Sequence, residues 1–183
     1  MAEGCSMSYI EPTAQVTGDA RVYGNTQVTG DARVSGNAQV SGNAQVTGDA
    51  QVFGDALVYG NAIVSGDAMV SGNAQVSGTA LVSGNTRVTD HMVIDRTDGY
   101  ITMGPIGSEH RIVTAAWDYK RHEICVRAGC WYGSIEELEA RIAPTGKHGW
   151  EGSDAERWRT QYECLIAAAS HIPEPDAWPK VAA

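Results

Sequence analysis

Hydrophobic positions recur at every sixth residue across the first half of the chain. The first position of each six-residue unit is Ile10 and then Val from Val16 to Val88, which gives fourteen hexads. A period of six fits no helix, but it suits short strands joined by tight corners in a stacked β-coil. We therefore predict that this β-branched side chain points into a core and that its two neighbours point outward.

The residues that follow each Val predict the corners between the strands. The third position is Gly throughout from Gly18 to Gly84, and the fourth is Asp or Asn in that span apart from Thr79. These residues tolerate positive φ angles best. The fifth position is Ala or Thr from Ala14 to Thr86 and is small enough to fit under the corner. Each hexad is then one side of a prism, and about three hexads make a turn.

The hexads resemble those of the hexapeptide-repeat proteins, in which an aliphatic residue is followed four places later by a small one. Val40 and Ala44 have this spacing, and the resemblance covers about residues 10 to 94. It implies a mainly β protein that begins with a left-handed parallel β-helix, and the left-handed sense comes from the family alone. We expect about four to five coils, which at about 4.8 Å per coil make a prism roughly 22 Å tall.

Outward positions of the middle coils carry apolar side chains where other coils carry Gln, Ser, Thr or Arg. These residues are Phe53, Leu57, Tyr59, Ile63, Met69 and Leu81. Such a group indicates contact between chains, and the open ends of a coil expose strand edges that need covering. Because the resembling families are commonly trimers, we predict a homotrimer with these residues in its interfaces. The alternative is that some of them pack under the chain's own C-terminal half.

Hexapeptide-repeat prisms host two kinds of enzyme, which are acyltransferases with a His base and γ-class carbonic anhydrases with zinc on three His. Residues 1–90 contain no His, and no hexad is interrupted by a loop. His91 lies in the last, degenerate hexad, where a structural role is the simpler interpretation. We therefore predict no catalytic residue, no metal and no cofactor. The alternative is a transferase or hydratase that has moved its His onto the C-terminal module.

The six-residue period ends after Ile94. The sequence after it predicts a small α+β domain over residues 95–172, followed by an extended tail over residues 173–183. Residues 1–9 form an N-terminal segment. Strands are expected at 100–103, 111–117 and 123–127.

Two capping boxes predict the helices of this domain. Ser134-Ile-Glu-Glu137 opens a helix to about Ile142, and Ser153-Asp-Ala-Glu156 opens a helix to about His171. The side chains of the second helix that are expected to face the core are Trp158, Tyr162, Leu165, Ile166 and Ala169.

Two motifs of this domain resemble a module that follows hexapeptide repeats in many uncharacterised bacterial and phage proteins. They are Gly104-Pro-Ile-Gly-Ser108 and the segment 126–138 with its Gly129-Cys130 pair. The match covers about residues 99 to 170, but Ala128 and Glu109 stand where relatives often have Cys and Arg. The resemblance implies a phage or mobile-element origin and supplies no mechanism.

The same region holds a candidate binding site. The Gly-Pro-Ile-Gly-Ser segment is interpreted as a loop whose N–H groups hold an anion, beside basic and aromatic side chains that suit a nucleotide-like small molecule. The predicted ligand-binding residues are Gly104, Gly107, Ser108, His110, Arg111, Thr114, Arg127 and Trp131. The alternative is a plain turn between strands, with the charges on exposed faces and the aromatic residues in the core.

Other residues of the domain offer weaker candidates. Cys130 with His110 or His122 as its base would make a nucleophile, but a Cys between Gly and two aromatic residues is better interpreted as a small buried side chain. His148 lies in a Gly-rich segment and is interpreted as an exposed loop residue.

Charge and composition limit the partners and the location. The net charge is -9, and neither half of the chain carries the basic stripe that generic nucleic-acid binding requires. The sequence shows no signal peptide, no apolar run near about eighteen residues and no CxxC pair. We expect a protein of the bacterial host's cytoplasm that binds no membrane. Its expected function is to sequester a nucleotide-type immune signal of the host. The alternatives are to block a host defence protein through the acidic prism, or to form part of a virion or its connector.

Overall fold

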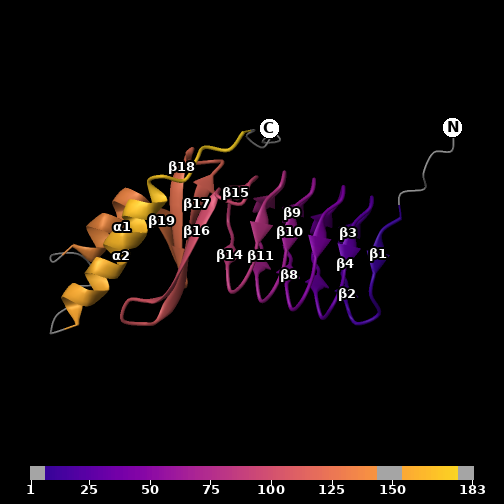
Figure 1. Cartoon of the computed structure of the whole chain (residues 1–183), viewed down its shortest axis with the longest axis horizontal. Coiled ribbons are helices and arrows are strands. Elements are labelled where there is room, and N and C mark those ends of the chain that lie inside the picture. Colours follow the sequence, from indigo (N-terminus) through magenta and orange to yellow (C-terminus); the bar gives the residue numbers. More distant parts are fainter. Residues whose placement is uncertain (1–6, 144–153, 177–183) are drawn as a thin grey trace.

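The chain folds into a parallel β-solenoid that is closed at its C-terminal end by an antiparallel sheet and two helices (Figure 1). This arrangement is seen in a computed structural model, which describes residues 7–143 and 154–176. The coils of the solenoid stack along the long axis of the molecule, from indigo to magenta. The helices lie at the end of the molecule away from the first coil.

Two-residue strands form the sides of the solenoid, and each predicted hexad supplies one of them. They are β1 (Tyr9–Ile10), β2 (Gln15–Val16), β3 (Arg21–Val22), β4 (Gln27–Val28), β5 (Arg33–Val34), β6 (Gln39–Val40), β7 (Gln45–Val46), β8 (Gln51–Val52), β9 (Leu57–Val58), β10 (Ile63–Val64), β11 (Met69–Val70), β12 (Gln75–Val76), β13 (Leu81–Val82) and β14 (Arg87–Val88).

The strands stack into three parallel sheets, which we call the first, second and third sides of the prism. The first side contains β1, β4, β7, β10 and β13, and the second contains β2, β5, β8, β11 and β14. The third contains β3, β6, β9 and β12, and it ends with β15 (Met92–Ile94). Pairing joins residues eighteen apart, as Gln27 with Gln45. The predicted β-solenoid is therefore confirmed, with about five turns, while its left-handed sense stays a prediction.

One Val and one Ala per hexad fill the inside of the prism. Every inward Val from Val28 to Val82 is fully buried. The corner Gly residues have φ between 59° and 87°. A Cβ on Gly42 would lie 3.0 Å from the backbone N and O atoms of Gly60 in the next coil. Both the backbone conformation and the spacing of the coils therefore require Gly at the corner.

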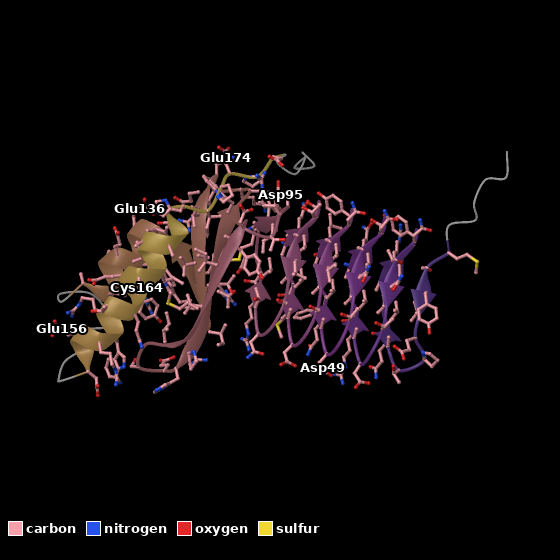
Figure 2. The ribbon with its side chains drawn as sticks, viewed as in Figure 1. Asp49, Asp95, Glu136, Glu156, Cys164 and Glu174 are labelled. Carbon is pink, nitrogen blue, oxygen red and sulfur yellow. The ribbon has the colours of Figure 1, made fainter. Side chains whose placement is uncertain are left out.

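The fourth position of the hexads forms polar columns along the corners of the prism. At one corner, Asn25 donates to Asn43 at 3.2 Å and Asn43 donates to Asn61 at 3.0 Å. At another, the same eighteen-residue step stacks three carboxylates, and Figure 2 shows the middle one, Asp49, at the lower edge of the solenoid. The other two are Asp31 and Asp67.

Four strands follow the solenoid and form an antiparallel sheet, which we call the end sheet. They are β16 (Tyr100–Ile106), β17 (Arg111–Asp118), β18 (Glu123–Ala128) and β19 (Trp131–Ser134), in the order β16-β17-β18-β19. Strand β17 also pairs with β15, so the end sheet continues the third side of the prism. β19 was not predicted, and β16 extends through Gly104 and Pro105, which were predicted to lie in a loop.

One face of the end sheet covers the open end of the prism. The Tyr100 hydroxyl donates to the carbonyl of Leu81 at 3.0 Å, and the Thr114 hydroxyl accepts from the N–H of Arg87 at 3.3 Å. Thr102 lies 3.2 Å from the hydroxyls of both Thr86 and Thr114. Tyr100 and Thr114 thus satisfy backbone groups on the last coil that would otherwise form an open edge.

Two helices, α1 (Ile135–Ile142) and α2 (Ala155–Ala169), cover the opposite face of the end sheet (Figure 1). Val113 and Val126 of the sheet form a core there with Leu138 of α1 and Leu165 of α2. Neither helix is long and apolar enough to cross a membrane, and this holds for every helix of the described ranges.

The helix termini differ from one another in their capping. The predicted capping box of α1 is present, with Ser134 accepting from the N–H of Glu137 and Glu137 accepting from the N–H of Ser134. Helix α2 follows Asp154, and Ser153 of the second predicted box lies outside the described residues. On α2, Trp158 is only half-buried although it was expected in the core, whereas Tyr162 is buried as expected.

Candidate ligand-binding site

The end sheet separates the predicted ligand-binding residues. Ser108, Arg111 and Trp131 line one cavity. Thr114 and Arg127 instead face the solenoid, because alternate residues of a strand point to opposite faces. Thr114 accepts from Arg87, as described above, and Arg127 pairs with Asp90 of the last coil at 3.2 Å. These two residues therefore hold the end sheet on the solenoid.

The Gly-Pro-Ile-Gly-Ser motif is part strand and part turn. Gly104 lies in β16, and Gly107 begins the turn to β17 with a φ of 71°. The N–H of Gly107 donates to the side-chain oxygen of Gln161 on α2 at 2.9 Å. His110 ends the same turn and is exposed. The motif therefore fixes the turn against α2 and positions the residues on either side of it.

The cavity lies at the edge of the end sheet, where two turns meet both helices, and its volume is about 90 Å³. Glu109 comes from the β16–β17 turn and Arg111 begins β17. Trp131 begins β19, Arg141 lies on α1 and Tyr162 lies on α2. A space of this size holds an anionic head group, whereas whole drug-sized ligands occupy pockets of about 300 Å³ or more.

Two guanidinium groups dominate the electrostatics of the cavity. The Arg111 Nε donates to the Glu109 carboxylate at 2.9 Å, and the Arg141 guanidinium lies 5.5 Å from the centre of the Trp131 ring. With two Arg and one Glu, the lining carries a net charge of one positive unit. Guanidinium groups bind carboxylate and phosphate oxygens in a planar, paired geometry, so the cavity favours an anion.

Two glycines with positive φ shape the turns around the cavity. A Cβ at Gly129 would lie 3.2 Å from the Arg111 Nε, and a Cβ at Gly107 would lie 2.9 Å from the ring of Tyr162. Arg111 and Tyr162 can line the cavity only because these positions lack side chains. Burial raises the pKa of the Tyr162 hydroxyl, which therefore stays protonated at neutral pH.

Among the lining residues that the sequence did not assign to the binding site, Arg141 and Tyr162 come from the two helices. From the sequence, Tyr162 is expected only in the core, and Arg141 has no role. The signal that could have found Arg141 is its place on α1, three residues after the core residue Leu138 and directly before Ile142. A charged side chain beside two core positions has to lie at the rim of the buried face.

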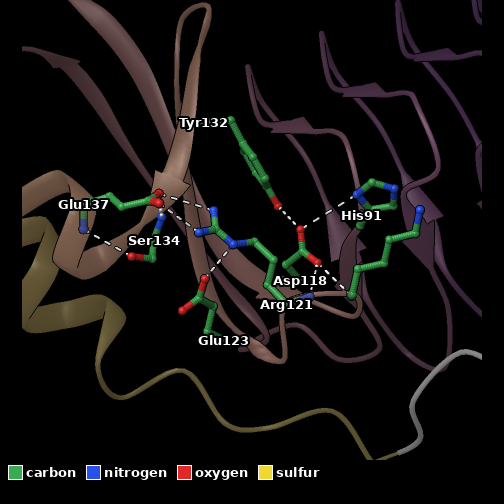
Figure 3. A network of polar contacts seen from close by, with 8 residues as sticks. His91, Asp118, Arg121, Glu123, Tyr132, Ser134 and Glu137 are labelled. Atoms are coloured by element: carbon green, nitrogen blue, oxygen red, sulfur yellow. Dashed lines mark hydrogen bonds and ion pairs between the residues drawn. The ribbon is translucent and has the colours of Figure 1, made fainter.

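A second group of polar side chains joins the solenoid to α1 (Figure 3). The Asp118 carboxylate is 1% exposed, and it accepts from the Tyr132 hydroxyl at 2.5 Å and from the N–H groups of Lys120 and Arg121 at 2.7 and 2.9 Å. The Nδ1 of His91 lies 4.0 Å from the same carboxylate. This geometry supports the structural interpretation of His91.

The same network continues to the first turn of α1. Arg121 binds Glu123 at 2.6 Å and Glu137 at 3.0 Å, and Glu137 also belongs to the capping box (Figure 3). The Arg121 guanidinium and the N–H of Ser134 lower the pKa of the Glu137 carboxyl. Through these contacts the network links the last coil of the solenoid to the first turn of α1.

The cysteine chemistry in this region is not that of a nucleophile paired with His122. Burial raises the pKa of the Cys125 thiol to about 11. Cys130 is exposed, so its interpretation as a small buried side chain was wrong. It follows the C-terminal end of β18, whereas His122 precedes the N-terminal end of that strand. Six strand residues separate the two by roughly 20 Å. Within residues 7–143 and 154–176, no three His, Cys, Asp or Glu side chains gather as a metal site would need.

The outward apolar residues of the prism form a belt around all three sides. Ile63 and Leu81 lie on the first side, and Met69 lies on the second beside Phe53, which directly follows β8. The third side carries Leu57 and Tyr59. Tyr59 and Leu81 are 37% and 39% exposed, and the other four are half-buried within the single chain.

Part of the repeat matches a known family. The model of the YdcK beta solenoid repeat matches residues 14–30, 38–52, 50–66 and 64–78, all within the solenoid. No curated protein and no solved structure gave a significant match. The chain is therefore a β-solenoid repeat protein by its sequence as well as by its fold.

Proposed function

We propose that this β-solenoid protein is a non-enzymatic binding protein that holds a small, nucleotide-like anion in the cavity of its C-terminal domain. The observation that carries the proposal is the convergence of Arg111, Arg141 and Trp131 on one small cavity. The guanidinium groups suit a phosphate, and an indole ring suits the face of a base. Because the cavity encloses only about 90 Å³, the phosphate lies inside and the base lies over the mouth.

The experiment is calorimetric titration of the purified protein with adenosine 5′-monophosphate at low salt. We expect binding that weakens at least tenfold in Arg111→Gln and in Arg141→Gln. Arg33→Gln is the matched control, since Arg33 is exposed on β5 of the solenoid, far along the chain from the cavity. Equal affinities in all four proteins, or no binding at all, would contradict the proposal.

The binding protein forms a homotrimer in this proposal, and the apolar belt supports it. Around a three-fold axis of parallel prisms, each prism contacts its neighbours through two of its three sides. Such a trimer therefore buries the two belt residues on each of two sides, and the two belt residues on the third side stay exposed.

Substitutions made one side at a time test the trimer by native mass spectrometry. The double variants are Ile63→Gln with Leu81→Gln, Phe53→Gln with Met69→Gln, and Leu57→Gln with Tyr59→Gln. We expect the trimer to dissociate in two of them and to persist in the third. A monomeric parent protein would overturn the trimer, and three equally intact variants would place its interface elsewhere than on the belt.

A host defence protein held by the acidic prism is the second candidate function. The observation that favours it is the column of Asp31, Asp49 and Asp67 on one corner. A complex formed there weakens as salt rises and weakens further in Asp49→Asn. The sequestration of an immune signal, the phage origin, the cytoplasmic location, the virion role and the enzyme alternatives stay predictions from the sequence.

A further inference from the structure

We propose that Glu109 occupies the anion position of the cavity in the unbound protein, and that the ligand which displaces it is the dianion of a phosphate monoester. This inference rests on the proposed function and names the chemical class that the same cavity takes. It follows from the position of one carboxylate, from the count of charges and from the size of the space.

Glu109 already presents a carboxylate to the cavity. Its oxygen accepts from the Arg111 Nε at 2.9 Å, and the two residues are only two positions apart on the β16–β17 hairpin. The side chains are 64% and 50% exposed. An ion pair this exposed is weakened by water and salt, so it can open without disturbing the fold. Glu109 is therefore a removable occupant of the anion position.

The charge count selects the class of ligand. When Glu109 swings away, Arg111 and Arg141 leave two positive charges on the lining. A carboxylate from solution brings one negative charge, as Glu109 does, but Glu109 is tethered two residues away and so has a far higher effective concentration. A phosphate monoester carries about −1.5 to −2 charges at pH 7 and three acceptor oxygens. It therefore brings more negative charge and more acceptor oxygens to the two guanidinium groups than a carboxylate does, and this surplus displaces Glu109.

The shape of the cavity fits the same class. A volume of about 90 Å³ holds a tetrahedral phosphate head group and excludes a larger enclosed ligand. Ser108 adds a hydroxyl to the lining. The glycines at positions 107 and 129 keep the two turns from filling this space with side chains. The ester substituent then extends past Trp131, which begins β19 at the edge of the cavity.

Calorimetric titrations of the full chain and of Glu109→Gln with four probes test the inference. The probes are glucose 6-phosphate, adenosine 5′-monophosphate, acetate and adenosine. We expect both phosphate monoesters to bind the parent protein and to bind Glu109→Gln about tenfold more tightly. Acetate should bind only the variant, and adenosine should bind neither. Glu123→Gln is the matched control for loss of one Arg-paired carboxylate outside the cavity, and it should leave these affinities unchanged.

Affinity should also fall as the pH drops below about 6, because the phosphate then takes up its second proton and loses one charge. Unchanged affinity in Glu109→Gln, or acetate binding to the parent protein as tightly as a phosphate monoester, would overturn the inference. Equal binding of the sugar phosphate and the nucleotide would support the phosphate class while contradicting the nucleotide-like ligand of the proposed function. Absence of binding by every probe to either protein would overturn both.

Discussion

The hydroxyl of Thr114 accepts a hydrogen bond from the backbone N–H of Arg87 at 3.3 Å. Arg87 lies in β14, the last strand on the second side of the prism, so this bond satisfies a donor at an open strand edge. The hydroxyl of Thr102 lies 3.2 Å from that of Thr114. The end sheet therefore closes the solenoid with side-chain hydroxyls rather than with another strand on this side.

Replacing Thr114 by Val should destabilise the protein. The isosteric change removes only the hydroxyl, and the loss of an acceptor for a part-buried N–H costs about 1–2 kcal/mol. Urea denaturation measures the free energy of unfolding. Thr47→Val on the outer surface of the first side is the control and should change it little, so equal losses in the two variants would contradict the closing role of Thr114.

Substitution by Ala is expected to have different effects at two other threonines, Thr26 and Thr86. Thr26 and Thr86 both occupy the inward fifth position of a hexad, where most hexads have Ala. The Thr26 hydroxyl is buried and bonds to no described residue, whereas the Thr86 hydroxyl donates to the carbonyl of Ser83 at 2.7 Å. An unsatisfied buried hydroxyl costs about 1–3 kcal/mol.

We therefore expect Thr26→Ala to leave the stability unchanged or to raise it, and Thr86→Ala to lower it by about 1 kcal/mol. The measurement is the denaturation midpoint of each variant under identical conditions. A loss in Thr26→Ala as large as that in Thr86→Ala would show that the Thr26 hydroxyl has a partner.

The corner glycines are expected to differ in their tolerance of Ala. Gly60 has a φ of 74°, and a Cβ there would lie 3.0 Å from the N atom of Gly78 in the next coil. Gly84 has a similar φ of 63°, but a Cβ there would meet nothing within 4 Å. Gly84→Ala therefore tests the backbone conformation alone and should cost about 1 kcal/mol.

Gly60→Ala adds the collision with the next coil, and we expect it to cost about 1–3 kcal/mol more than Gly84→Ala. Thermal unfolding followed by circular dichroism gives both values. Two equal shifts in Tm would mean that the coils can separate enough to admit a methyl group.

Stability should fall at alkaline pH. Burial raises the pKa of Cys125 from 9.0 to about 11, and burial together with the bond to Asp118 raises the pKa of Tyr132 above its usual value of 10.0. A group whose pKa is higher in the folded state stabilises the fold fully below its unfolded pKa, and this stabilisation is lost as the pH rises above that value.

We therefore expect the free energy of unfolding to decline from about pH 9 upward. Urea titrations at pH 7, 9 and 10.5 measure it. Cys125→Ala should make the decline shallower between pH 9 and 10.5, whereas Cys164→Ala, at an exposed site, should not. A decline that is the same in both variants would exclude Cys125 as one of its sources.

The solenoid could be predicted from the sequence because every hexad repeats the same local arrangement. Val40 is buried, and Gly42 turns the corner with a φ of 72°. The end sheet could not be predicted to the same depth. Residues 112–117 read Ile-Val-Thr-Ala-Ala-Trp without a clean alternation, because both faces of β17 are covered. The side to which Thr114 points depends on the pairing of Val93 with Trp117, which no local pattern encodes.

The candidate site, like the end sheet, could be predicted only in part. Ser108 lies in the β16–β17 turn, Arg111 begins β17, and Trp131 begins β19 just after the β18–β19 turn. All three are therefore at the same end of the sheet, and a local interpretation of the motifs brings them near one another. Arg141 and Tyr162 reach the cavity only through the packing of two helices on the end sheet. Their distance in sequence from Arg111 carries no information about that packing.

Pairing at a step of eighteen residues also governs how the length of this protein can change. Removing three hexads shortens the solenoid by one strand spacing, about 4.8 Å, and leaves each later residue on its original side. Removing a single hexad instead moves every later residue to the next side, so that the end sheet turns by a third of a revolution about the long axis. The distance of the cavity in the end sheet from the N-terminal end can thus change only in steps of one coil if the cavity is to keep its direction, and that direction is set by the number of hexads before it.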